Sequence, residues 1–148
     1  MSFSNEFLYD FKPVYEGILM AKDVKPERAV VEVIDEEQEG AGMFEPAGAL
    51  EVLEQIGDDV NTLTIYTDRA AYFREFAETM YEKNGLVSLI VSKKRLGLAK
   101  KTVGCSSIFL FDFEWNSAFY EKQIALGKHY IPIHKRAWRT AENLDIAV

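Results

Sequence analysis

The sequence predicts a single α/β domain of three layers, α/β/α, with a mostly parallel sheet of about five strands between two layers of helices. Three observations support this fold class. The 148 residues have the length of one domain, and no linker rich in Pro, Gly or Ser divides residues 1–148. Short runs rich in Val, Ile, Phe and Tyr alternate with segments of helical spacing. Such alternation favours βαβ crossovers, which make neighbouring strands parallel.

Five runs are expected to be strands, because each is short, rich in β-branched and aromatic residues and bounded by charged or turn residues. They are residues 29–34, 63–67, 86–91, 107–113 and 130–133. We expect the second, third and fourth to be parallel neighbours. Residues 86–91 and 108–111 are apolar on both faces, which is typical of central strands. Glu32 and Pro132 indicate that their own strands lie nearer an edge or a partly solvated face of the sheet.

The clearest helix is expected at residues 69–84, where five apolar side chains recur at helical spacing: Phe73, Phe76, Ala77, Met80 and Tyr81. Asp68 is expected to cap its start, and Gly85 offers a left-handed stop. An N-terminal helix is expected at about 13–22, and others from Pro46 to Gly57, at 116–126 and at 135–143. Helices of this length between the strands give a Rossmann-like architecture.

Charge is distributed unevenly along the chain. Residues 1–92 hold 19 acidic and 7 basic side chains, whereas residues 93–148 hold 5 and 10, so the two parts carry −12 and +5. The formal total of −7 argues against nucleic-acid binding by the chain as a whole. The opposite charges also permit pairing between copies in a homo-oligomer. With neither a secretory signal pattern nor a bilayer-length apolar run, we expect a cytoplasmic protein without a membrane partner.

The strongest charge feature is a basic segment that follows the strand expected at 86–91. It contains Lys93, Lys94, Arg95, Lys100 and Lys101, and two forked cations, Arg136 and Arg139, follow at i, i+3 on the last expected helix. In a parallel sheet this segment lies at the carboxyl edge, where α/β folds place ligands. The segment therefore predicts a binding or interaction module for a phosphate-bearing small molecule or an acidic protein face. The bland alternative is a solvated loop that balances the acidic part.

Three expected strands end in an aspartate, namely Asp35, Asp68 and Asp112, and Glu114 shares a strand face with the last of these. Carboxylates that converge at the carboxyl edge suit Mg²⁺, which prefers oxygen ligands. The alternative function is therefore a Mg²⁺-dependent phosphoryl-transfer or hydrolytic enzyme. Aspartate at a strand end is also a common turn former and helix cap. The sequence does not decide whether the protein is an enzyme.

Other chemical motifs are incomplete. Gly40 and Gly42 resemble part of a dinucleotide fingerprint, but Glu45 stands where a small residue is required, and the acidic run 35–39 would repel a pyrophosphate. His129 and His134 would point to opposite faces of a strand and so cannot share a metal ion. A single cysteine, Cys105, excludes an internal disulfide. No cofactor other than Mg²⁺ is indicated.

Overall fold

The computed structural model describes residues 10–36, 48–98, 105–114 and 117–133 of the chain. Five strands form one sheet, in which every neighbouring pair is parallel and the order is β3-β2-β1-β4-β5. The strands are β1 (Val30–Ile34), β2 (Leu63–Tyr66), β3 (Ser88–Val91), β4 (Ile108–Asp112) and β5 (His129–Pro132). The chain builds the sheet outward from β1 to β3 and then crosses back to the other side of β1. The carboxyl ends of β1 and β4 therefore flank the point where the strand order reverses.

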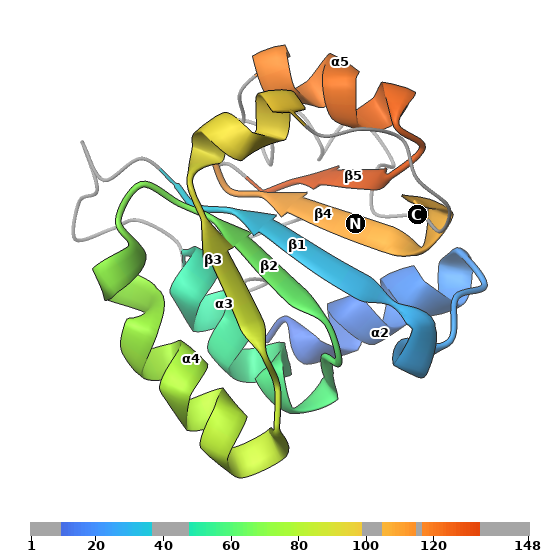
Figure 1. Ribbon diagram of the computed structural model, residues 1–148. Helices are drawn as coiled ribbons and strands as arrows, with labels where there is room; N and C mark the ends of the chain where they lie inside the picture. The colour runs from blue at the N-terminus through green and yellow to red at the C-terminus, as the bar shows by residue number, and fades with distance from the viewer. Residues whose placement is uncertain (1–9, 37–47, 99–104, 115–116, 134–148) are drawn as a thin grey trace.

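Helices cover both faces of this sheet (Figure 1). One face carries α2 (Lys12–Ala21), α3 (Ala49–Ile56) and α4 (Ala70–Asn84). The other face carries α5 (Ser117–Ala125) and a 3₁₀ segment, η3 (Lys93–Leu98), drawn in yellow after β3. Shorter 3₁₀ turns are η1 (Pro26–Arg28), η2 (Gly57–Asp59) and η4 (Cys105–Ser107). The three-layer, Rossmann-like α/β class predicted from the sequence is confirmed.

Strand positions in the sheet differ from the expectation at three points. β1 is the central strand although it carries Glu32, because the Glu32 carboxylate is neutralised by the Lys128 ammonium at 2.7 Å. β3 is an edge strand, and its apolar side chain Leu89 is exposed. β2 and β3 are parallel neighbours as expected, whereas β4 lies beside β1. The position of Pro132 on an edge strand, β5, is confirmed, since an edge tolerates a missing backbone donor.

The ends of α4 show one correction and one confirmation. Asp68 does not cap this helix; instead the Thr67 hydroxyl accepts a hydrogen bond from the Arg69 backbone N–H at 3.0 Å. Gly85 ends the helix in the left-handed conformation, with φ at 71°, as predicted. The other described helices agree with expectation within about three residues, the scatter usual for element boundaries. Pro46 and the helix expected at 135–143 lie outside the described residues.

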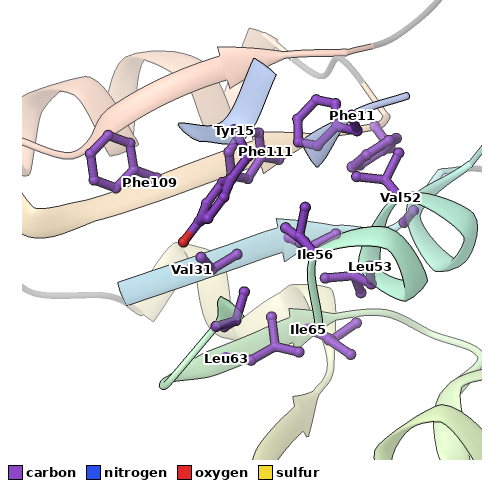
Figure 2. Close-up of a cluster of buried hydrophobic side chains, with 14 of the residues drawn as sticks. Phe11, Tyr15, Val31, Val52, Leu53, Ile56, Leu63, Ile65, Phe109 and Phe111 are labelled. Atoms are coloured by element: carbon purple, nitrogen blue, oxygen red, sulfur yellow. The ribbon is translucent and has the colours of Figure 1, made fainter. Parts of the chain in front are cut away.

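The larger apolar core lies between the sheet and the α2–α3–α4 layer (Figure 2). Phe11 packs edge-on against Phe111 of β4, with ring centroids 5.5 Å apart. Tyr15, one turn further along α2, also packs against Phe111. On the opposite face the apolar cluster is small and comprises Ile34, Tyr66, Leu96 and Leu110. The two faces of the sheet are therefore packed very differently.

None of the helices in the described part of the chain combines the length and the apolar character that crossing a membrane requires.

Candidate functional site

The carboxyl edge of the sheet carries the four acidic residues that the sequence singled out. Asp112 is the last residue of β4 and is paired in register with Ile34, whereas Asp35 follows one position further along β1. Because successive side chains of a strand point to opposite faces, Asp35 faces the α2–α3–α4 layer and Asp112 faces η3 and α5. The two carboxylates nearest the strand reversal are thus separated by the sheet itself.

Asp35 is held by an arginine and a threonine from the end of β2. The Arg69 guanidinium donates from Nε to Asp35 Oδ2 at 2.7 Å and from Nη2 to Asp35 Oδ1 at 2.8 Å. The Thr67 hydroxyl donates to Asp35 Oδ2 at 2.7 Å. The guanidinium also lies over the Tyr72 ring, 3.9 Å from the centroid, which fixes its plane. These contacts form because β1 and β2 are neighbours, which brings Asp35 after β1 close to Thr67 and Arg69 after β2.

These contacts set the protonation of Asp35. Burial alone would raise the pKa of this carboxyl group, but the hydrogen bonds from Arg69 and Thr67 outweigh it and lower the pKa. The same bond to Asp35 raises the pKa of Arg69. The pair is therefore fully ionised at neutral pH, and neither charge is offered to a ligand.

The side chain of Glu36, which follows β1, lies at the N-terminal end of α3. Its Oε1 accepts a hydrogen bond from the Ala49 backbone N–H at 3.0 Å, and its Oε2 lies 3.4 Å from Arg69 Nη2. A side chain at Gly48 would collide with the same carboxylate. Burial and the neighbouring Asp35 raise the pKa of Glu36, with burial the larger cause.

In a dinucleotide-binding domain a pyrophosphate sits at the N-terminus of the helix that follows the first strand, which is the position of α3 here. Here the protein's own carboxylate fills that place; Gly40 and Gly42 lie outside the described residues.

Asp112 and Asp68 each have their own partners on the other side. Asp112 accepts a hydrogen bond from the Tyr130 hydroxyl of β5 and one from the Glu114 backbone N–H, the latter at 2.8 Å. Asp68 accepts hydrogen bonds from the Ser92 hydroxyl at 3.3 Å and from the Lys93 backbone N–H at 3.4 Å. Asp68 therefore positions the start of the basic segment.

An ion pair joins the two strand ends that flank η3. Lys93 Nζ lies 3.3 Å from Glu114 Oε1, and both side chains are largely buried. Lys93 follows β3 and Glu114 follows β4, and β2 and β1 lie between these strands in the sheet. The ion pair therefore holds Lys93, the first residue of η3, over the carboxyl ends of β2 and β1.

Within η3 the remaining cations point outward. Lys94 and Arg95 are exposed, and no ion pair within the described ranges holds either of them. Leu96, by contrast, is completely buried in the small apolar cluster. The structure thus separates the predicted anion-binding set into one structural lysine and two exposed cations. Four of its members, Lys100, Lys101, Arg136 and Arg139, lie outside the described residues.

Polar groups beneath η3 were missed by the sequence reasoning. Glu32 and Lys128 form a buried ion pair, and Gln123 of α5 is fully buried with its Nε2 donating to the Leu96 carbonyl at 3.4 Å. Burial, reinforced by Glu32 and opposed by Arg95, raises the pKa of Tyr66 to about 12. The available signal was Glu32 itself, since a charge in a central strand requires a buried partner.

A metal site finds no support in the part of the chain that the structure describes. There, no three His, Cys, Asp or Glu side chains come close enough together to hold an ion. Asp35, Asp68 and Asp112 have separate partners instead, and His129 stacks on Phe109 with centroids 4.7 Å apart. The proposed Mg²⁺ ligation stays a prediction, as does the role of Glu114 in it.

Comparison with models of known protein families, with curated proteins and with solved structures gave no significant match to this chain.

Proposed function

We propose that the protein binds a phosphate-bearing small molecule at the carboxyl edge of the sheet, through Lys94 and Arg95 of η3. The observation that supports the proposal is the position of these two cations in the fold. Both side chains are exposed on η3, and the ion pair between Lys93 and Glu114 holds this segment close to the point where the strand order reverses. In open α/β sheets ligands bind in the crevice at such a point.

The α3 side of the same edge is unsuited to an anion. The acidic pair Asp35 and Glu36 lies there, and the start of α3 already binds the Glu36 carboxylate. The Arg69 charge is matched by Asp35 through two hydrogen bonds. Among the described residues, no positive charge is therefore left on this side for a phosphate group to bind. The η3 side is therefore the favourable approach.

The η3 segment is anchored well enough to hold a ligand. Leu96 fills the small apolar cluster, Gln123 donates to its carbonyl, and Lys122 Nζ donates to the Gly97 carbonyl at 3.2 Å. The two hydrogen bonds come from α5 and the apolar contacts of Leu96 come from the sheet, and together they fix the backbone without using the Lys94 or Arg95 side chains. A pre-positioned pair of cations loses less entropy on binding than a mobile loop does.

The experiment is calorimetric titration with pyrophosphate, using the wild type and the double reversal Lys94→Glu/Arg95→Glu. We expect the reversal to weaken binding by about tenfold or more, because two charge-assisted hydrogen bonds are lost. Wild-type binding should weaken as ionic strength rises. The melting temperature should change little, since exposed charges contribute little to stability.

A matched control carries the same charge change elsewhere. Arg28 of η1 and Arg74 of α4 are both exposed and lie away from η3. The double variant Arg28→Glu/Arg74→Glu should bind pyrophosphate as the wild type does. Equal losses in the two double variants would show a general charge effect and overturn the proposal. Binding of a polyglutamate peptide in preference to pyrophosphate would replace the small molecule with an acidic protein partner.

A further inference from the structure

A pocket of about 450 Å³ lies at the opposite edge of the sheet from the proposed anion site. It is formed by one side of α2 from Tyr15 to Met20, the turn after this helix, Pro26 of η1 and Asp59 of η2. Because η1 precedes β1 and η2 precedes β2, this is the amino edge of the sheet. The volume falls in the range of small-molecule sites, which is about 300–1,000 Å³.

The wall of the pocket is mainly apolar. Leu19 is buried, Val24 comes from the turn after α2, Pro26 is the first residue of η1, and Met20 lies at the rim with 81% of its surface exposed. An exposed methionine beside an apolar hollow gains burial when a ligand fills the hollow. The occupant therefore has an apolar body.

A buried hydroxyl provides the second observation. Tyr15 lines the pocket, is 1% exposed, and its hydroxyl has no hydrogen-bond partner within the described residues. Figure 2 shows that its hydroxyl end points away from Phe11, toward the start of β1. Burial, and secondarily Asp59, raise the pKa of Tyr15 to about 12, so the group stays protonated. A buried polar group without a partner is uncommon in native structures and requires an explanation.

The charges around the pocket select the ligand's charge. Glu16, Asp23 and Asp59 contribute carboxylates, against one lysine of the lining, Lys25. Asp59 is paired with Lys12 at 3.2 Å, whereas no ion pair in the described ranges involves Glu16 or Asp23. The surplus of negative charge at the mouth favours a cation.

The backbone at Asp23 agrees with a role for its carboxylate. Asp23 has a φ of 55°, in the left-handed region. It follows the end of α2, where the Val24 N–H donates to the Leu19 carbonyl and closes the helix. Glycine is the usual residue at such a position, because it adopts this conformation without strain. An aspartate there adds a charge at the pocket that a glycine would lack.

We propose that this pocket binds an organic amine with an apolar body, its ammonium group near Glu16 and Asp23 and its apolar part between Leu19, Val24 and Pro26. A polar atom at the inner end of the ligand bonds the Tyr15 hydroxyl. The site is separate from the anion site at the carboxyl edge, and neither proposal depends on the other.

The test uses three probes that share an indole ring and differ at the end of a two-carbon side chain: tryptamine, tryptophol and indole-3-acetate. Each is titrated at millimolar concentration into ¹⁵N-labelled protein while backbone amide shifts are followed. Tryptamine should shift the amides of Leu19, Met20, Asp23 and Val24 and leave those of η3 unchanged. Tryptophol should bind about two- to fivefold more weakly, because each exposed ion pair changes the affinity by less than about tenfold. Indole-3-acetate should bind more weakly still, because its carboxylate is repelled by the acidic side chains.

Three variants separate binding from folding. Asp23→Gly should melt at a higher temperature than the wild type and yet bind tryptamine about two- to fivefold more weakly. Tyr15→Phe keeps the ring against Phe111 and should weaken binding by about threefold or more through loss of one hydrogen bond. Glu54→Gln, an exposed acid on α3 away from the pocket, should bind as the wild type does.

Equal binding of the three probes would reduce the pocket to a nonspecific apolar hollow and overturn the proposal. The same holds if tryptamine produces no shifts at the amino edge, or if Asp23→Gly and Tyr15→Phe are folded and bind tryptamine unchanged. Pyrophosphate binding at η3 is read in separate spectra, so failure here leaves that proposal intact.

Discussion

The two faces of the sheet differ in what holds them together. Against α2, α3 and α4 the packing is mainly apolar, with Phe11, Phe73 and Phe111 almost entirely enclosed, and the largely buried ion pair of Asp35 and Arg69 lies at its carboxyl edge. Against η3 and α5 the apolar cluster is small, and buried polar groups such as Glu32, Lys128 and Gln123 lie beside it. The first face supplies most of the hydrophobic stabilisation, since that scales with the apolar area removed from water.

The difference assigns the two faces different roles. Polar groups buried with partners fix geometry more than they add stability. The η3 face is therefore the one that orients exposed side chains, here Lys94 and Arg95, while the other face keeps the fold intact. Substitutions on the two faces should accordingly have different consequences.

The largest effect is expected on the apolar face. Phe76→Ala on α4 should lower the free energy of unfolding by about 3–5 kcal/mol, because the ring is buried and its removal leaves a cavity. Tyr81 is on the same helix but is 62% exposed, so Tyr81→Ala should cost less than about 0.5 kcal/mol. Urea unfolding measures both. Similar losses in the two variants would mean that α4 does not pack as described.

A somewhat smaller effect is expected on the polar face. Lys128→Met leaves the Glu32 carboxylate buried without its partner and should cost about 3 kcal/mol. The double variant Glu32→Leu/Lys128→Met should recover most of this loss, since an apolar pair of similar size avoids the cost of desolvating two charges. Chemical denaturation of the two variants gives the comparison. A double variant less stable than Lys128→Met would contradict it.

The smallest of these effects concerns two adjacent carboxyl groups at the carboxyl edge. Asp35 has a lowered pKa, so its stabilising contribution is complete above about pH 4, the unfolded value, and is lost as pH falls through the folded pKa. Asp35→Asn should therefore cost about 2 kcal/mol at pH 7, and the difference from wild type should shrink below pH 4. Unfolding titrations at pH 7 and pH 3 measure this.

Glu36 is the matched control because its pKa is shifted the other way. A raised carboxyl pKa favours folding at low pH, and that advantage is lost as pH rises through the folded value. Glu36→Gln mimics the neutral form and should change stability at pH 7 by less than about 0.5 kcal/mol, while Gln still accepts the Ala49 hydrogen bond. A larger loss of stability at pH 7 for Glu36→Gln than for Asp35→Asn would contradict the opposite pKa shifts of these two carboxyl groups.

The apolar face could be predicted from the sequence because its information is periodic. The stripe of Phe73, Phe76 and Met80 defines α4, and Phe109 and Phe111, which are two residues apart and so share one face of β4, both lie in the same core. Tyr81 was included in the stripe but is exposed, because the inward stripe on α4 is narrower than the spacing alone implies.

The polar face could not be predicted in the same way, because its pairs join residues far apart in the chain. Glu32 pairs with Lys128 and Lys93 with Glu114, and neither pairing has a local pattern. Strand order is equally nonlocal: β3 is apolar in sequence like a central strand, yet lies at the edge. The three strand-end aspartates were correctly placed at one edge, but the pleat directs Asp35 and Asp112 to opposite faces.

The central claim, that the η3 face orients cations for an anion, is tested most directly by mapping backbone amide shifts of ¹⁵N-labelled protein during titration with pyrophosphate. We expect shifts at Lys94, Arg95 and Leu96 and at the ends of β1 and β4, with Leu19 and Val24 at the amino edge unchanged. Shifts confined to the amino edge or to the exposed side of α4, or no shifts at all at low ionic strength, would contradict it.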